Sequence, residues 1–324
     1  MKFVAKTPFT IATLILAICS IAGFFSSAGH IPELLSHFRL QYLVGALLCL
    51  TIFALQKDTF RSLAAGLLVV INGYTIAPLY FSGIPSTSYE ISENRVHKIL
   101  LSNVHSSNNE HQRLINLIQQ ESPDVLVLLE ITDAWLESLQ TIQSAYPFKK
   151  AIARSDNFGI AVFSKLPFDR ADVRYWGISG FPSLALQYQL AGTKTGVAKG
   201  EGITLLATHP LPPITKDMLQ QRDTQLLQAA AEAAQPAGPV IMLGDFNITP
   251  WSSAFKQSAE LAGLSNCRNG FGILPTWPAS LTSPLLMIPI DHCLVSNHFQ
   301  VVNIRTGANI GSDHLPLIIE LRHL

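Results

Sequence analysis

The chain has 324 residues, a formal net charge of zero, 14% charged residues and a mean hydropathy of +0.30. This length suits one large domain or two smaller ones, and the composition is too apolar for a purely soluble protein. The apolar excess lies at the N-terminus, because residues 1–90 hold five basic and three acidic residues while the remainder holds seventeen and nineteen.

The N-terminal part contains three stretches without a charged residue, over residues 7–32, 40–56 and 62–89. A helix that crosses a bilayer needs about 20 apolar residues, with about 17 as the lower limit. We therefore expect a membrane region at residues 1–81 with about three transmembrane helices, in contact with lipid through residues 9–81. Two alternatives remain open: a buried helical hairpin in a soluble domain, and a cleaved signal peptide over residues 1–28.

The cationic residues of this region predict its orientation. Lys2 and Lys6 precede the first stretch, and Lys57 and Arg61 lie between the second and the third, whereas the loop after the first stretch has only Arg39. Since cytoplasmic loops carry an excess of Lys and Arg, both cationic ends are expected in the cytoplasm. Three spans then place the rest of the chain outside the cytoplasm, as in a multi-pass protein of a bacterial inner membrane.

A polar, Ser-rich linker is expected at residues 82–95, and from residue 96 onward apolar runs alternate with amphipathic stretches. Strands are expected at 97–104, 124–130, 159–168, 184–191, 203–209, 239–245, 290–296, 299–306 and 315–322, and helices at 109–122, 133–146, 215–234 and 252–263. Strands and helices interleave, several strands are neighbours, and no Gly-rich loop of the P-loop or dinucleotide type occurs. The pattern predicts a mixed-sheet α/β sandwich rather than a purely parallel sheet.

Polar side chains end several of the apolar strands. The stretch "VIMLGDFNIT" (240–249) turns polar after Leu243, and Asp245 and Asn247 share one face if the segment is extended. The same feature recurs at Asn103, Glu130, His209, Asp291, Asp313 and His314. Any one of these residues is also common in turns, but a carboxylate such as Glu130 after five apolar residues is costly to bury without a partner.

The set is chemically coherent. It offers carboxylate and amide oxygens, two imidazoles and no thiolate, which suits Mg²⁺ or Mn²⁺ better than Zn²⁺. Hydrolysis of a phosphoester needs a metal that polarises the phosphate, a group that activates water, and donors for the developing charge. The strand-end residues therefore predict a phosphoester hydrolase.

The order of these motifs resembles that of the endonuclease/exonuclease/phosphatase (DNase I-like) superfamily. The matching segments are "SNV" (102–104), Glu130 in "DVLVLLE", "ATH" (207–209), "GDFN" (244–247), "PID" (289–291) and "GSDHLP" (311–316). The resemblance covers residues 96–324 and implies a catalytic domain there. It also implies a four-layered α/β sandwich of two packed mixed sheets flanked by helices, and a Mg²⁺- or Mn²⁺-dependent hydrolase that cleaves a phosphoester with activated water.

The resemblance also implies where the metal and part of the substrate bind. Asn103 and Glu130 would hold the metal, with Glu130 the principal ligand, and Asp313 would support the metal side. "NFGIAVFSK" (157–165) is similar to the central strand of the family, so Asn157 and Phe158 would contact substrate.

Five residues would carry the catalytic step by the same resemblance. Asp245 would orient or deprotonate the attacking water, or protonate the leaving group. His314 would contact the scissile phosphate in a dyad with Asp291, which fixes its tautomer. Asn247 and His209 would donate hydrogen bonds to the phosphate. The identity of the general base stays open.

Some residues near these motifs are expected to be structural. His292 stands where the family often has an aromatic residue, and strand alternation points it away from Asp291. Trp277 in "PTWP" is expected to pack. Cys267 and Cys293 have no metal-site spacing, and a disulfide between them is permitted if the domain lies outside the cytoplasm.

The substrate stays open among nucleic acids, phospholipids and small phosphoesters, and no protein partner is evident. Residues 91–324 carry a net charge of about −2, with seventeen basic and nineteen acidic residues, whereas duplex-binding proteins have a basic surface. A membrane-anchored nuclease and a phospholipid or inositol-phosphate phosphatase are the alternatives. A catalytically inactive binding module would not need all the strand-end residues, and a transporter would need charged residues inside its spans.

Overall fold

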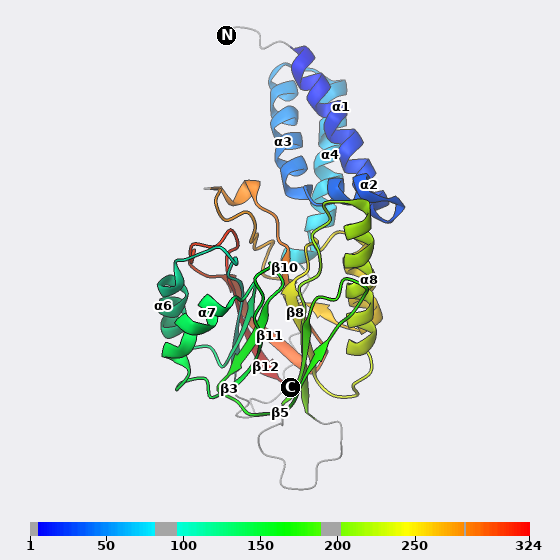
Figure 1. Cartoon of the computed structure of the whole chain (residues 1–324). Helices are drawn as coiled ribbons and strands as arrows, with labels where there is room; N and C mark the ends of the chain where they lie inside the picture. The colour runs from blue at the N-terminus through cyan, green and yellow to red at the C-terminus, as the bar shows by residue number, and fades with distance from the viewer. Residues whose placement is uncertain (1–5, 82–95, 189–201, 282) are drawn as a thin grey trace.

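The computed structural model describes residues 6–81, 96–188, 202–281 and 283–324 (Figure 1). The expected linker at 82–95, the end of the third uncharged stretch (82–89) and the end of the expected strand at 184–191 lie outside the described residues.

The N-terminal part is helical, as expected. It comprises α1 (Lys6–Ala22), the 3₁₀ turn η1 (Gly23–Ala28), α2 (His30–Ser36), α3 (Arg39–Leu55), α4 (Thr59–Ile76) and the short α5 (Pro78–Phe81). Helices α1, α3 and α4 pack side by side above the rest of the chain (Figure 1). Two of the described helical segments, 7–28 and 59–76, are long and apolar enough to cross a membrane. The pair α2 and α3, bent by 66°, would make a third if it formed one span.

The helix bundle exposes many large apolar side chains and buries several polar ones. Leu14, Ile18 and Leu67 are at least 60% exposed. Buried between the helices, Arg39 Nη1 donates to the Ser20 carbonyl oxygen (2.7 Å) and Asn72 Nδ2 donates to Ser20 Oγ (2.9 Å). This distribution is the reverse of that of a helix in water and suits an apolar surrounding.

The rest of the described chain forms two six-stranded sheets. The first has the order β11 (Phe299–Thr306), β12 (Leu317–His323), β1 (Val96–Asn103), β2 (Val125–Leu129), β4 (Ile160–Ser164) and β3 (Phe148–Ile152). The second has the order β5 (Phe168–Arg174), β6 (Ser183–Tyr188), β7 (Ile203–Ala207), β8 (Val240–Asp245), β10 (Asp291–Val295) and β9 (Ser265–Asn266). The pairs β1–β2 and β7–β8 are parallel and the other pairs are antiparallel, so both sheets are mixed.

Helices cover the outer face of each sheet and complete the four layers. Helices α6 (His111–Glu121) and α7 (Asp133–Ser138) and the 3₁₀ turn η2 (Leu139–Ile142) lie on the first sheet, and α8 (Lys216–Ala233) and α9 (Ser253–Ala262) lie on the second (Figure 1). The two sheets bury a shared core that includes Leu101, Val127, Leu205 and Leu243. The predicted four-layered α/β sandwich is confirmed.

Three strands and one helix differ from the sequence prediction. The strands β3, β5 and β9 were not predicted, and all three lie at the edge of a sheet. Edge strands are solvated, so β3 ("FKKAI") and β5 ("FDRADVR") tolerate charges that hide the strand pattern. The single helix expected at 133–146 is wrong, because the segment divides into α7 and the tighter turn η2.

Candidate active site

The strand-end residues gather at the end of the sandwich nearest the N-terminal helices. In the first sheet, β1 and β2 are parallel, with Asn103 paired with Leu129, so Asn103 and Glu130 leave the sheet together. In the second sheet, Asp245 at the end of β8 pairs with Asp291 at the start of the antiparallel β10. Pairing within the first sheet brings together Asn103 and Glu130, 27 residues apart, and the packing of the two sheets brings Asn103 to Asp245, 142 residues apart.

Backbone conformation at this edge is unusual. Glu130 and Asn247 are non-glycine residues with positive φ, +61° and +51°, which is uncommon and tends to mark functional sites. At Gly244, a Cβ atom would lie 1.8 Å from the carbonyl oxygen of Thr208. Any side chain there would push β8 away from the loop after β7, so this position requires glycine.

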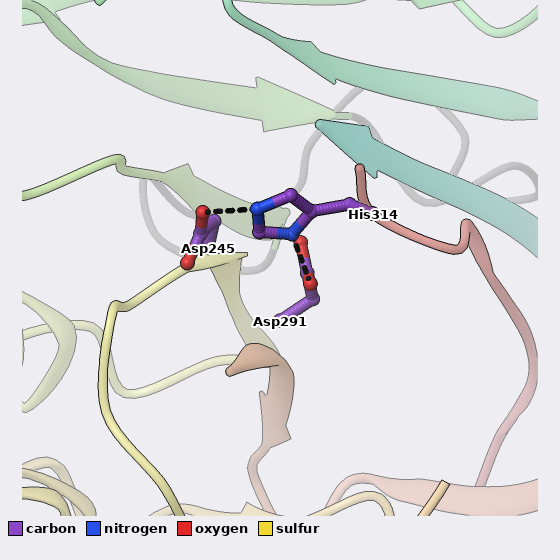
Figure 2. Close-up of side chains that lie close together, drawn as sticks. All are labelled: Asp245, Asp291 and His314. Atoms are coloured by element: carbon purple, nitrogen blue, oxygen red, sulfur yellow. Dashed lines mark hydrogen bonds and ion pairs between the residues drawn. The ribbon is translucent and has the colours of Figure 1, made fainter. Parts of the chain in front are cut away.

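Asp245 lies at the centre of the site (Figure 2). Its Oδ2 is 3.6 Å from His314 Nε2, and Asp291 Oδ2 is 2.8 Å from His314 Nδ1. The imidazole therefore lies between two buried carboxylates. The Oδ1 atom of Asp245 accepts a hydrogen bond from the backbone N–H of Asn247 (3.0 Å), which fixes the carboxylate orientation.

His209 approaches Asp245 from the loop after β7. Its Nε2 is 3.4 Å from Asp245 Oδ2, and its ring centroid is 5.3 Å from that of Phe158. The buried Nδ1 of His209 and the buried Oδ1 of Asp291 have no hydrogen-bond partner within the described residues. A buried polar atom without a partner is costly, so both atoms keep hydrogen-bonding capacity that no described residue uses.

On the other side of Asp245 lies the acidic group of the first sheet. Asn103 Nδ2 donates to Glu130 Oε1 (2.9 Å) and to Asp245 Oδ2 (3.1 Å). The backbone N–H of Ser106 donates to Glu130 Oε2 (3.0 Å). His105 Nδ1 lies 3.7 Å from Glu130 Oε2 and 3.4 Å from an oxygen of Asp313, so these two carboxylates are neighbours.

The donor set of this acidic group suits a hard divalent cation. Glu130 and Asp313 supply carboxylates, and the buried Oδ1 of Asp313 accepts no hydrogen bond within the described residues. Asn103 Oδ1 accepts from the backbone N–H of His105 (3.0 Å), which leaves one lone pair. Oxygen donors of this kind are those that Mg²⁺ and Mn²⁺ prefer.

Ligand atoms of Asp245, Asp291 and His314 also lie within 4.8 Å of one another. Both ring nitrogens of His314 face carboxylate oxygens, however, and a protonated imidazole cannot bind a metal. The contacts of this second group therefore suit hydrogen bonding better than metal binding.

Electrostatics define the protonation states. Burial disfavours the charged form of His314, but the carboxylates of Asp291 and Asp245 outweigh it and raise its pKa to about 10. Burial likewise disfavours ionised Asp245, but the positive charge of His314 and the hydrogen bond with His209 lower its pKa to about 2. The pKa of His209 is raised, because the contacts with Asp245 outweigh its burial. At neutral pH the site thus holds an ionised Asp245 beside a protonated His314.

The raised pKa of His314 predicts a pH dependence of stability. The folded protein binds the His314 proton more tightly than the unfolded chain does, so protonated His314 stabilises the fold. This stabilisation is complete below the unfolded pKa of about 6.5 and is lost as the pH rises through about 10. In EDTA, the melting temperature of the full chain in detergent should therefore fall from pH 6.5 to pH 10 more steeply than that of His314→Gln. Parallel pH profiles for the two proteins would contradict this assignment.

The structure places the two predicted substrate-contact residues at the mouth of the site. Asn157 is exposed, and its Oδ1 accepts from Ser106 Oγ (2.6 Å). Phe158 is half-buried and stacks on Phe181 with ring centroids 3.6 Å apart. Asn247 Nδ2 donates to the carbonyl oxygen of Pro210 (3.0 Å), which leaves one amide hydrogen for a ligand.

Sequence reasoning missed several residues of the site. His105 and Ser106 contact the acidic group, and Phe181 stacks on Phe158. His105 and Ser106 directly follow "SNV", which is the one signal that could have pointed to them. Trp277, which was expected only to pack, also donates a hydrogen bond from Nε1 to Asp313 Oδ2 (3.2 Å).

The residues expected to be structural lie away from the reacting groups. His292 is buried, and its ring nitrogens contact the Ile248 carbonyl oxygen (2.7 Å) and Arg268 Nη1 (3.1 Å). Burial and the charge of Arg268 hold its pKa well below the usual range. Cys267 and Cys293 are buried free thiols with sulfur atoms 2.9 Å apart.

Fold and site together define a DNase I-like α/β sandwich protein. The chain belongs to the Endonuclease/Exonuclease/phosphatase family, whose model matches residues 100–314. Members of this family hydrolyse phosphoester bonds and generally depend on a divalent metal. Among curated proteins, none matches the sequence of this chain.

Solved structures share the fold at low sequence identity. An endonuclease/exonuclease/phosphatase from Beutenbergia cavernae DSM 12333 has a TM-score of 0.57 at 19% identity, over 71% of this chain and 72% of that chain. D. rerio TDP2 complexed with a single-strand DNA product has a TM-score of 0.57 at 16% identity, over 70% and 99%. The human nocturnin catalytic domain with a bound sulfate anion has a TM-score of 0.54 at 16% identity, over 72% and 98%.

Proposed function

We propose that the protein is a membrane-tethered, divalent-metal-dependent phosphodiester hydrolase. Residues 1–81 form the membrane region, 82–95 the linker and 96–324 the catalytic domain. The observation that carries the proposal is the position of Asp245, whose carboxylate contacts Asn103, His209 and His314 at one buried point. A single phosphate and its attacking water placed there would reach an acid, a base and the acidic group at once.

Glu130, Asp313 and Asn103 would hold the Mg²⁺ or Mn²⁺ ion. When bound, such an ion polarises the phosphate and stabilises the charge that develops in the transition state. Asn103 would also keep Glu130 and Asp245 in place through its amide nitrogen, as it does in this structure.

The remaining side chains would perform the proton transfers. Ionised Asp245 accepts the proton of the attacking water, and protonated His314 donates to a phosphate oxygen. Asp291 holds His314 in the orientation that points Nε2 at the reacting centre. His209 and Asn247 add hydrogen bonds to the phosphate, which strengthen as negative charge develops there.

The distribution of apolar side chains supports the membrane region. The outer faces of α1 and α4 expose leucine and isoleucine, while the buried polar groups pair inside the bundle. Lys57 and Arg61 lie at the turn between α3 and α4, at the end of the bundle farthest from the sandwich (Figure 1). With that end in the cytoplasm, the catalytic domain lies on the other side of the membrane.

The metal dependence is testable with a water-soluble substrate. The full chain in detergent should hydrolyse bis(p-nitrophenyl) phosphate, lose this activity in EDTA and regain it with Mg²⁺ or Mn²⁺. Glu130→Gln removes a ligand charge and almost no volume, so activity should fall at least about 10²-fold while the melting temperature in EDTA stays near that of the wild type. Full activity of this variant would remove Glu130 from the metal site.

A membrane-tethered nuclease is the second candidate. The stacked pair Phe158 and Phe181 beside His209 favours it, because flat aromatic surfaces stack on nucleic-acid bases. A single-stranded oligonucleotide tested beside other phosphodiesters separates the two candidates.

A further inference from the structure

Several direct contacts tie the sandwich beside the site to the base of the helix bundle. Arg222 Nη2 donates to Glu33 Oε1 in α2 (2.7 Å), and its Nη1 donates to the carbonyl oxygen of Asn247 (3.1 Å). His37 Nδ1 and Thr249 Oγ1 are 3.0 Å apart, and His30 Nε2 lies 2.8 Å from the Pro213 carbonyl oxygen. The site therefore lies directly against the end of the bundle.

Another contact comes from the segment that carries the 3₁₀ turn η3 (Pro284–Leu286). Gln41 Nε2, in the first turn of α3, donates to the carbonyl oxygens of Leu285 (3.0 Å) and Met287 (3.1 Å). In Figure 1 this orange segment stands beside the lower end of α3. It follows Trp277, which contacts Asp313 in the site, so the segment reaches from the site to the bundle.

Large apolar side chains on these loops face outward. Ile214, next to Pro213, is 69% exposed, and Leu285 and Leu286 of η3 are 50% and 57% exposed. We call these three residues the apolar rim. Both parts of the rim lie next to the bundle, because Ile214 follows Pro213, which contacts His30 beside the 64% exposed Ile31, and Leu285 contacts Gln41 of α3. Exposed apolar surface of this kind marks a membrane or protein contact, and its position beside the apolar surface of the bundle favours the membrane.

We propose that the apolar rim enters the interfacial layer of the bilayer that holds the bundle, and that the site hydrolyses the phosphodiester in the head group of a lipid from that bilayer. This inference rests on the proposed function. Water forms a new P–O bond and one P–O ester bond breaks. The water proton passes to Asp245, protonated His314 gives its proton to the leaving oxygen, and the proton on Asp245 then passes to His314, 3.6 Å away, so that the products are an alcohol and a phosphomonoester.

The charges around the site favour a lipid over a nucleic acid. A nucleic acid needs several cationic contacts to flanking phosphates. Arg154, the cation beside Phe181, is paired with Asp156 (2.6 Å). A lipid needs one phosphate contact in the site and an apolar surface beside it.

The test uses the full chain in vesicles of phosphatidylcholine, phosphatidylethanolamine and phosphatidylglycerol. Four substrates are compared at equal concentration: these lipids, their deacylated head-group diesters, bis(p-nitrophenyl) phosphate and a single-stranded oligonucleotide. We expect EDTA-sensitive lipid hydrolysis at least about tenfold faster than that of the deacylated diesters, because only the lipids share the bilayer with the rim. Equal rates for the lipids and their deacylated diesters, or faster cleavage of the oligonucleotide, would overturn the inference.

Variants of the rim separate lipid access from chemistry. Leu285→Ser with Leu286→Ser should lower lipid hydrolysis at least about tenfold and leave hydrolysis of bis(p-nitrophenyl) phosphate unchanged. Leu261→Ser is the matched control, since Leu261 is 48% exposed on α9 and lies eight residues, or about 12 Å, beyond the start of that helix at the bundle. It should change neither rate, and an equal loss in the control would remove the role of the rim.

The two proposals fail in different ways. Hydrolysis of bis(p-nitrophenyl) phosphate without hydrolysis of any lipid would overturn the lipid inference and leave the proposed function standing. The absence of hydrolysis of every phosphodiester would overturn both.

Discussion

Replacing Asp245 with asparagine should lower phosphodiester hydrolysis at least about 10²-fold, the lower range for one acid–base group. The change keeps the size of the side chain and removes the charge that faces His209 and His314. Asparagine also retains an oxygen for the backbone N–H of Asn247, so the turn should keep its shape. The measurement is the turnover number with bis(p-nitrophenyl) phosphate, beside a circular dichroism spectrum that shows an intact fold.

A double variant tests whether Asp245 and His314 act as a unit. His314→Ala should cost a similar factor, and the double variant should lose less than the product of the two losses, because residues that act together are non-additive. Multiplicative losses would mean that the two side chains act independently, against the geometry in Figure 2.

The second large effect concerns the fold rather than the chemistry. Glu33→Ala removes the α2 carboxylate that pairs with Arg222, a residue with no exposed surface. Removing one partner of a buried ion pair costs up to about 3–5 kcal/mol when the other charge is left alone, but Arg222 also pairs with Asp223 (2.6 Å), so the cost here lies below that range. The free energy of unfolding, measured with urea in detergent, should fall by about 1.5–3 kcal/mol, the range for a hydrogen bond to a charged group.

Glu110→Ala supplies the control for Glu33→Ala. Glu110 pairs with Arg113 at 2.7 Å, but both side chains are 54% exposed, and exposed pairs contribute about 0–1 kcal/mol. Equal effects of the two changes would show that the contact between α2 and α8 does not stabilise the protein.

The fold and the positions of the site residues could be predicted from the sequence because both depend on local patterns. Apolar runs marked the central strands, and the polar residue that ended each run marked its exit from the core, as at Glu130. The partners of these residues could not be predicted. Asn103 forms a hydrogen bond with Asp245, which lies 142 residues later in the sequence. No local pattern in the sequence shows that these two residues meet in the fold.

The contact between the bundle and the sandwich was missed for the same reason. Glu33 lies between the uncharged stretches 7–32 and 40–56, and its partner Arg222 lies in the helix expected at 215–234. Each is ordinary in its own segment. The ion pair forms only because the helix bundle packs against the sandwich, and the hydrophobic periodicity of either segment cannot predict that packing.

This docking has a consequence for biosynthesis. Glu33 leaves the ribosome 189 residues before Arg222, and at about 5–20 residues per second the interval is about 10–40 s. During this time α2 has no catalytic domain to bind, and its carboxylate must be solvated by water or by lipid head groups. The helices are therefore made before the site is complete. The contact between Glu33 and Arg222 can form only once α8 has been made, and Asn247, whose carbonyl oxygen accepts from the same Arg222, follows 25 residues later.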